Sequence, residues 1–350
     1  MDDKRDTDAT YGDIRLPDAP VLVLAGLNGH WLTPDGEMLS TSLEETAIRA
    51  AQSPPLLVHR LNMATRLGVN PFPAYDLLEL FAFAYPARSC LPTVRGLARA
   101  LHLPIPDAPE EQPLLLFEAT NSILNYLTGL KNKERKAAAS IAATMAKAGW
   151  SWGPSVVAAL GEPEEEPGRF GGLDRWLDLA EWPDYAPEPP PDDIAVSEFE
   201  ARERLKEMLG GDAEPRPQQA DYTALASHAF VPRNQADVPN LVLAEAGTGT
   251  GKTPGYIGPA SLWAEKNGAA VWISTYTKNL QRQIDTELDR LYPDRRDKAE
   301  KAVVRKGREN YLCLLNLEDA LQGGFSGRPA ILAQLVARWA AFTEDGDMVG

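Results

Sequence analysis

A glycine-rich stretch constrains the fold of this chain more than any other feature of its sequence. The sequence reads NLVLAEAGTGTGKT over residues 240–253 and continues into YIGPASLWAEKNG. A short apolar run of β type, a glycine-rich turn and a helix-forming segment, in that order, are the setting of a phosphate-binding loop. The pattern [AG]-x4-G-K-[ST] arises by chance in roughly 3% of chains of this length, so a glycine-rich turn without a ligand is the weaker interpretation.

Each residue type in this loop has a chemical reason to be there. Gly247, Gly249 and Gly251 permit positive φ angles and let backbone N–H groups converge on phosphate oxygens at a helix N-terminus. Lys252 can supply a cation for the β- and γ-phosphates, and the Thr253 hydroxyl can complete the shell of a Mg²⁺ ion. The predicted nucleotide-binding residues are Ala246, Gly247, Thr248, Gly249, Thr250, Gly251, Lys252 and Thr253, with Lys252 and Thr253 as the candidate catalytic residues.

Polar residues on both sides of the loop are candidate contacts for a base and for nucleic acid. Upstream of the loop, Arg216 and Gln219 form an R-x-x-Q arrangement. A Gln side chain can read an adenine edge by two hydrogen bonds. Because polar residues are also common in turns, an ordinary turn remains the alternative interpretation of these two residues. Downstream, a strand predicted over residues 270–275 runs into a polar helix start, where α/β sheets place their ligand-binding loops. The predicted contacts with a sugar–phosphate backbone are Thr275, Thr277, Lys278 and Asn279.

The charge of the chain is concentrated in one segment. Of the formal net charge of −15, residues 162–214 carry −12, from 17 acidic and 5 basic residues. Their prolines and mutual repulsion predict an extended acidic linker, within which residues 170–182 and 196–209 have the apolar spacing of short helices.

At about 150 residues per domain, we expect an N-terminal domain over 1–158, a linker over 159–213 and a second domain over 214–350. Residues 278–308, with 10 basic and 6 acidic residues, form the one substantial basic segment, for which a solvated helix face is the plain interpretation.

The sequence also predicts the compartment. Two cysteines, Cys90 and Cys313, cannot build a disulfide framework, and the charged start MDDKRDTDAT does not suit a signal peptide. No apolar run is long enough to span a bilayer. We therefore expect a cytoplasmic protein without membrane contact.

Residues 216–350 resemble the first motor domain of superfamily 2 DNA helicases of the DinG/XPD type, the iron–sulfur branch. The loop EAGTGTGKT resembles that branch's ATP loop, PRPQQ its adenine-reading motif and STYTKNLQRQI its motif Ia, and KGRENYLC is similar to the sequence with the first of four cysteine ligands of a [4Fe-4S] cluster. The resemblance implies an α/β, RecA-like P-loop lobe, ATP and Mg²⁺ as cofactors, single-stranded DNA as partner, ATP-driven unwinding in DNA repair, and Cys313 as a cluster ligand. By residue type alone, Cys313 is more often a small buried hydrophobe.

The chain departs from this family in two respects. No cysteine follows Cys313, whereas a cluster held by protein thiolates normally takes four. No D-E-x-H motif and no second motor lobe occur before Gly350, although phosphoryl transfer needs Mg²⁺ ligands and an arginine from that lobe. We expect these residues to be the N-terminal part of a longer helicase, able to bind ATP weakly but not to turn it over.

The N-terminal domain faintly resembles the DnaQ-like 3′-5′ exonucleases, which have an RNase H-like α/β fold. Its pattern predicts a strand over 21–25, a hairpin turning at Pro-Asp-Gly 34–36, a buried strand in PPLLVH, and helices in YDLLELFAFAYPA, TVRGLARALHL and KAAASIAATMAKAGW. The family's D-x-E and H-x-A-x-x-D carboxylates are absent and only Asp76 fits a family position. One carboxylate cannot hold a metal pair, so we expect a scaffold without catalytic metals, in which His59 is a core or strand-end histidine.

Three hypotheses of function follow from the sequence. The first is the N-terminal part of a DinG-type ATP-dependent DNA helicase. The second is a non-catalytic module that binds nucleic acid, nucleotide or a partner. A P-loop kinase, the third, explains the loop but neither motif Ia nor KGRENYLC.

Overall fold

The chain forms two compact units, one of which is discontinuous in sequence. The computed structural model describes residues 14–161, 163, 191–210, 214, 216–235, 238–343 and 345–348. Unit 1 combines Met1–Glu181 with Gly307–Gly350, and unit 2, Trp182–Lys306, is inserted between these two segments. The predicted domain boundaries near residues 158 and 214 remain predictions, but residues 307–350 pack with the N-terminal part of the chain. The helix predicted over 170–182 lies outside the described residues.

A five-stranded sheet organises unit 1, in the order β3-β2-β1-β4-β5. The strands β1 (Val21–Ala25), β2 (Asn28–Leu32) and β3 (Met38–Ser42) are antiparallel, and β4 (Leu56–Leu57) and β5 (Tyr75–Asp76) are added in parallel. The loop between β2 and β3 closes with a hydrogen bond of 2.9 Å from the Thr33 N–H to the Glu37 carbonyl. The predicted first strand, hairpin and buried PPLLVH strand are confirmed.

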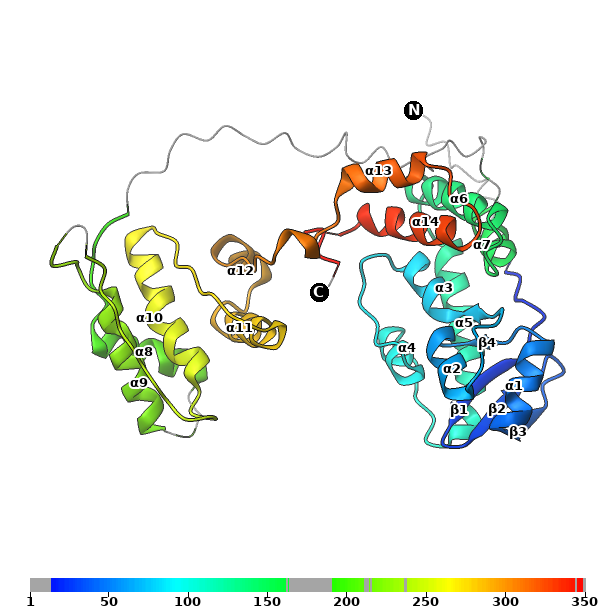
Figure 1. Ribbon diagram of the computed structural model, residues 1–350, viewed down its shortest axis with the longest axis horizontal. Coiled ribbons are helices and arrows are strands. Elements are labelled where there is room, and N and C mark those ends of the chain that lie inside the picture. The colour runs from blue at the N-terminus through cyan, green and yellow to red at the C-terminus, as the bar shows by residue number, and fades with distance from the viewer. Residues whose placement is uncertain are drawn as a thin grey trace, which may run out of the picture. The chain divides into compact units, whose positions relative to one another are not determined.

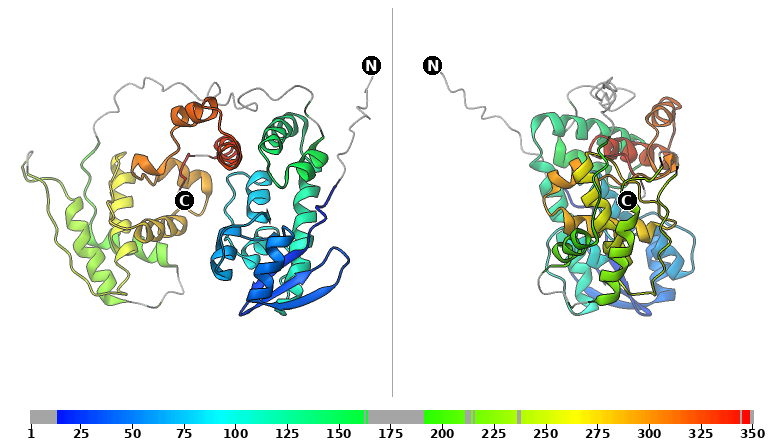
Figure 2. Two further views of the ribbon diagram at one scale, coloured as in Figure 1. Left: turned by 45° about the vertical axis from the view of Figure 1, so that its right-hand side comes forward. Right: turned by 90° about the vertical axis from the view of Figure 1, so that its left-hand side faces the viewer.

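Alternation along β1 assigns one set of helices to each face of this sheet. Val21 and Val23 join the core with residues of α5 (Gln112–Thr128), whereas Leu22 and Leu24 pack with residues of α1 (Leu43–Gln52) and α2 (Arg60–Leu67). Successive side chains of a strand point to opposite faces, so the sheet is covered on both sides. Figures 1 and 2 show α5 running along the sheet.

Further helices extend the α5 side of unit 1 away from the β2–β3 hairpin (Figure 1). They are α3 (Leu77–Ala84), α4 (Val94–Ala100), α6 (Asn132–Lys147), α7 (Gly153–Leu160), α13 (Leu314–Gln322) and α14 (Arg328–Ala340), with short 3₁₀ turns at Pro109–Glu111 and Arg308–Asn310. The helices predicted around α3, α4 and α6 are confirmed. Trp152 lies fully buried in this core and donates its indole N–H to the Asp76 carbonyl at 2.9 Å.

All regular secondary structure in the described residues of unit 2 is helical. It contains α8 (Glu198–Leu209), α9 (Pro217–Ser227), a 3₁₀ turn at His228–Phe230, α10 (Lys252–Asn267), α11 (Lys278–Leu291) and α12 (Arg295–Lys301). Helices α8, α9 and α10 pack against one another. Helix α8 confirms the helix predicted over 196–209 and begins with a capping box between Ser197 and Glu200.

The strands expected on either side of the glycine-rich loop do not form. Residues 241–244 and 270–275 have no β-ladder partner, and Leu241, Leu243 and Trp272 are 80%, 86% and 81% exposed. A strand is stabilised by ladder hydrogen bonds and by burial against a second layer, and isolated strand pairs are only marginally stable. The strand prediction is therefore wrong for these residues, while the mixed α/β class is confirmed by the sheet and helices of unit 1.

Candidate nucleotide site

The glycine-rich loop ends in a left-handed turn that starts helix α10. Gly249 and Gly251 have φ angles of 80° and 78°, and Gly251 occupies the N-cap position immediately before Lys252. A residue with a Cβ is strained at such angles, whereas glycine is not. The two glycines thus let the chain turn so that the first N–H groups of a 16-residue helix face the loop, which is the arrangement that binds anions.

The Lys252 ammonium folds back over the loop that precedes it. Its Nζ donates to the carbonyls of Ala246 and Gly247, both at 2.8 Å, and the Thr250 hydroxyl donates to the same Gly247 carbonyl at 2.9 Å. The Lys252 ammonium, with three donors, therefore lies at the glycine-rich loop and not out in solvent. Thr253, the second residue of α10, is 7% exposed.

Helix α9 holds the loop from the other side through the two residues predicted to lie near adenine. The Gln219 amide donates to the Gly251 carbonyl at 2.9 Å, and the Arg216 guanidinium donates to the Gly249 carbonyl at 3.4 Å. Gln219 is 4% exposed and lies three residues into α9. A Cβ on Gly251 would lie 2.2 Å from Gln219 Nε2, so the close approach of α9 also requires glycine there.

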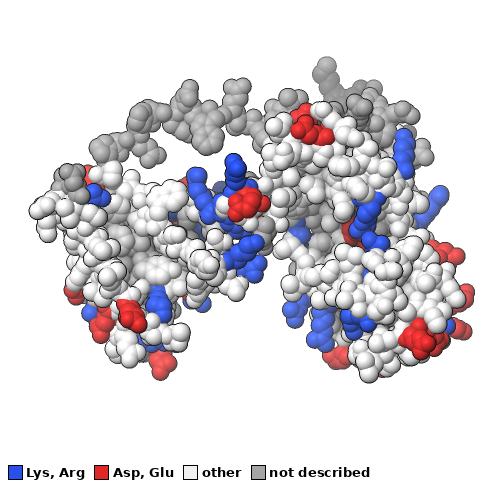
Figure 3. Space-filling view, viewed as in Figure 1, with Lys and Arg blue, Asp and Glu red and all other residues white. Residues whose placement is uncertain are grey.

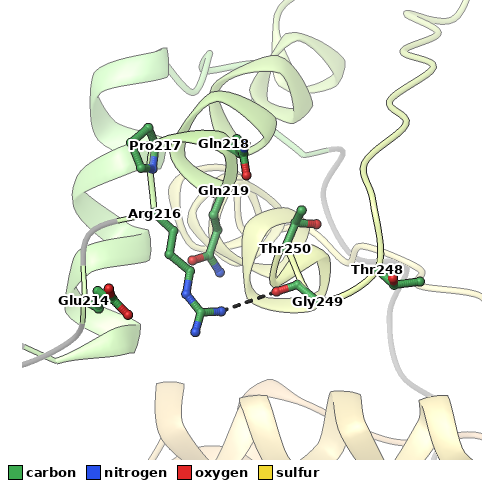
Figure 4. Close-up of a pocket in the computed structure, with 8 residues that line it drawn as sticks. All are labelled: Glu214, Arg216, Pro217, Gln218, Gln219, Thr248, Gly249 and Thr250. Atoms are coloured by element: carbon green, nitrogen blue, oxygen red, sulfur yellow. Dashed lines mark hydrogen bonds between the residues drawn. The ribbon is translucent and has the colours of Figure 1, made fainter.

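These contacts border an open pocket of about 420 Å³ between the start of α9 and the loop. Figure 4 shows Arg216 and Gln219 pointing toward the loop from α9, with the Arg216–Gly249 bond drawn. Sequence reasoning did not select Glu214 and Gln218, although both neighbour the predicted pair in the chain. The lining residues are Glu214, Arg216, Pro217, Gln218, Gln219, Thr248, Gly249 and Thr250.

The predicted nucleic-acid contacts gather at the start of helix α11. Thr277 caps this helix by accepting from the Leu280 N–H at 3.3 Å, and the Thr275 hydroxyl donates to the Thr277 carbonyl at 3.3 Å. Lys278 and Asn279, in the first turn, are exposed. Figure 3 shows Lys and Arg side chains over α12 and the segment after it, within the basic stretch that the sequence identifies.

Cys313 does not form part of a metal centre among the described residues. It is exposed and takes the N-cap position of α13. The described part of the chain has no group of three or more His, Cys, Asp or Glu residues that could hold a metal ion. A cluster held by four thiolates does not fit a sequence with two cysteines.

Asp76, the single family-like carboxylate of unit 1, caps a helix. Its Oδ1 accepts from the His59 and Leu78 N–H groups at 3.0 and 3.1 Å, and its Oδ2 accepts from the Arg60 N–H at 2.8 Å. The side chain is buried, and helix α3 begins directly after it. The D-x-x-E spacing to Glu79 is the sequence signal of such a cap. His59, two residues after the end of β4, has a φ of 62° and takes the N-cap position of α2.

Sequence comparison extends the resemblance beyond short motifs. A 135-residue part of the chain is 38% identical to the ATP-dependent DNA helicase YoaA of Haemophilus influenzae, a match that covers 38% of this chain and 20% of that protein. The matched part of the chain is thus similar to ATP-dependent helicases named YoaA and DinG. The 3'-5' exonuclease DinG of Bacillus subtilis is 36% identical over 146 residues, which are 41% of this chain and 15% of that protein. The ATP-dependent helicase DinG of Mycobacterium tuberculosis is 36% identical over 120 residues, which are 32% of this chain and 16% of that protein.

The similarity covers a limited part of these relatives. The chain spans a fifth or less of the length of each of these three relatives. No protein-family model and no solved structure matches it. Among the described residues, no helix is both long and apolar enough to cross a membrane.

Proposed function

We propose that this chain is part of a DinG-type ATP-dependent DNA helicase and that unit 2 binds ATP with Mg²⁺. The observation that carries the proposal is the meeting of the glycine-rich loop, the start of α10 and the Lys252 ammonium at one point. Lys252 Nζ lies 2.8 Å from two loop carbonyls, where it can exchange those acceptors for the oxygens of a triphosphate. ATP hydrolysis would supply the free energy for unwinding.

The remaining residues of the site have distinct proposed tasks. The loop N–H groups and the α10 N-terminus bind phosphate, and the Thr253 hydroxyl is a ligand for Mg²⁺. Arg216 and Gln219 border the cavity on the α9 side, where we place the adenine. Because Gln219 already donates to the Gly251 carbonyl, it links the base side of the site to the phosphate loop.

Calorimetry with Mg²⁺ and ATP tests this assignment. We expect heat of binding for the full chain and its loss in Lys252→Ala. Lys206→Ala, which removes a 72%-exposed lysine from α8, is the matched control and should bind as the wild type does. Absence of binding by a folded wild-type sample, or equal binding by Lys252→Ala, would refute the nucleotide site.

We further propose that the start of α11 binds single-stranded DNA. Lys278 and Asn279 are exposed at a helix N-terminus, next to the Thr277 cap, and such groups suit phosphate contacts. Fluorescence anisotropy with a labelled single-stranded oligonucleotide should show weaker binding by Lys278→Ala and a slope of log K against log salt smaller by about 1. An unchanged slope would remove Lys278 from the interface, and a preference for duplex DNA or RNA would change the proposed substrate.

We propose that unit 1 is an exonuclease-like scaffold without a catalytic metal pair. Three antiparallel strands followed by two parallel ones support the RNase H-like fold, and both Asp76 oxygens already accept backbone N–H groups. Arg66 donates to the Leu24 carbonyl at 3.2 Å, at the strand where the family has its D-x-E motif. Digestion of single-stranded DNA by the chain with Mn²⁺, abolished by Asp76→Asn, would overturn this proposal.

A further inference from the structure

Residues 50–106 of unit 1 depart from the charge pattern of the rest of the chain. The whole sequence averages one acidic residue in seven, whereas these 57 residues contain two, Asp76 and Glu79, beside five arginines and no lysine. Both carboxylates are already engaged. Asp76 accepts three backbone N–H groups, and Glu79 pairs with Arg328 and accepts the Trp150 indole N–H. The segment therefore presents cations without free carboxylates of its own to neutralise them.

Two of these arginines, Arg95 and Arg99, lie on helix α4. Both are exposed, and within the part of the chain that the structure describes neither forms a hydrogen bond or an ion pair. Residues four apart on a helix are neighbours, with about 5–6 Å between their Cβ atoms. Arg95 stands in the first turn of α4, where the helix dipole disfavours a cation. The stability of α4 therefore does not account for its position.

A stack of two rings and a guanidinium leads from α5 to the C-terminal end of α4. The rings of Tyr126 on α5 and Tyr85 have centroids 4.3 Å apart and planes at 30°, and the Arg88 guanidinium carbon lies 5.5 Å from the Tyr85 centroid. Arg88 Nη2 donates to the Ala100 carbonyl at 2.8 Å, which holds this exposed arginine beside α4. Tyr126 is 40% exposed. Figure 3 shows basic side chains over α4 on the face of unit 1 in view.

We propose that the surface formed by Tyr85, Arg88, Arg95, Arg99 and Tyr126, the arginine–tyrosine surface, binds single-stranded nucleic acid. Guanidinium groups form bidentate contacts with phosphate and stack on planar rings. Proteins that hold single strands without sequence preference combine cations for the backbone with aromatic rings for the bases. An acidic peptide would use the arginines but not the exposed ring, so it is the less favoured partner. This site belongs to unit 1 and depends neither on the nucleotide site nor on α11.

Fluorescence anisotropy of the full chain with labelled oligothymidylate and oligouridylate tests the arginines. Each phosphate contact with a single strand contributes about 0.7 to the slope of log K against log salt. The Arg95→Gln/Arg99→Gln double variant should therefore have a slope smaller by about 1.4 with the strand that binds. Arg49→Gln is the matched control and should leave the slope unchanged, because Arg49 pairs with Glu45 on α1, which packs on the other face of the sheet.

Three outcomes of this titration would overturn the proposal. The first is absence of binding by both strands, and the second is an unchanged slope in the double variant. The third is equally tight binding of an oligoglutamate of the same length, which would assign the surface to acidic protein segments.

Photocrosslinking locates the strand on unit 1, whatever α11 binds. With an oligonucleotide that carries 5-bromouracil, mass spectrometry of the wild-type chain should find crosslinked peptides from residues 85–103 or peptides containing Tyr126. Tyr126→Leu should lower the yield of these crosslinks severalfold, whereas Tyr126→Phe, which keeps the ring, should crosslink as the wild type does. Crosslinks confined to unit 2, or equal yields in Tyr126→Leu and the wild type, would refute the stacking role and with it the proposed site.

Discussion

Replacement of Asp76 distinguishes two roles for its carboxylate, a structural helix cap and a metal ligand. In Asp76→Ala, three N–H groups, those of His59, Arg60 and Leu78, lose an acceptor that is 7% exposed in the native state. A helix N-cap contributes about 1 kcal/mol, and each hydrogen bond to a charged group contributes roughly 1.5–3 kcal/mol, less where water reaches the freed N–H. We therefore expect Asp76→Ala to destabilise unit 1 by about 4 kcal/mol and Asp76→Asn, which keeps one acceptor oxygen, by about 2 kcal/mol.

Hydrogen exchange of the β1 and α3 amides measures this loss within unit 1 alone. A change of about 4 kcal/mol lowers their protection roughly a thousandfold, since 1.4 kcal/mol is tenfold. Thr93→Ala is the graded control, because Thr93 is exposed and caps α4 through one bond of 3.0 Å to the Gly96 N–H; it should cost about 1 kcal/mol.

A metal-binding carboxylate would behave in the opposite way. Removing a functional carboxylate commonly leaves stability unchanged or raises it, and Mn²⁺ would then protect the wild type but not the variant. An Asp76→Ala chain as stable as Thr93→Ala, or Mn²⁺-dependent protection of wild-type β1, would refute the capping role.

Two further predictions concern unit 2. Gly251→Ala should lower the unfolding free energy of unit 2 by about 2 kcal/mol, and Gly249→Ala should lower it by about 1 kcal/mol. Both glycines have a positive φ, but only a Cβ at Gly251 displaces Gln219. If urea titrations showed equal losses for the two variants, the Gln219 contact would not be the cause of the difference. Hydrogen bonds lower the pKa of the Glu200 carboxyl to about 2, with the largest effect from Lys266 and a smaller one from Ser197. The stabilisation of unit 2 by the ionised carboxylate is therefore complete above pH 4.5 and is lost as the pH falls toward 2. Urea titrations of unit 2 between pH 5 and 2.5 should show a smaller loss in Glu200→Gln than in the wild type, and identical curves would contradict the assignment.

The sequence predicted the elements of this chain whose stabilising partners are local. The strand predicted over 21–25, the Pro-Asp-Gly turn and the helix predicted over 196–209 depend on residues close together in the sequence, and all three form. The strands predicted over 241–244 and 270–275 depend on ladder partners distant in the sequence, and no such ladder forms among the described residues. Apolar, β-branched composition indicates that a segment can be a strand but does not supply its neighbour.

The same division holds within the nucleotide site. The order of glycines, Lys252 and Thr253 predicted a loop that leads into a helix, and α10 begins at Lys252. The bond from Gln219 to the Gly251 carbonyl was not predictable, because the R-x-x-Q pattern gives residue types and spacing but not the packing of α9 against α10. A residue proposed to read a base therefore also positions the loop, and only the structure shows this second contact.

Helix α3 shows the limit of sequence reasoning at its two ends. Its N-terminus is capped by Asp76, and the D-x-x-E spacing to Glu79 makes that cap readable from four adjacent positions. Its C-terminal carbonyl at Phe83 is capped by Arg338, and no local pattern connects an arginine in α14 with a helix 255 residues away. Arginine usually lies at the protein surface. A buried arginine such as Arg338 therefore marks a tertiary contact, here the one in which its guanidinium donates to the Phe83 carbonyl. The packing of α14 against α3 is thus a property of the folded unit and not of any local stretch of sequence.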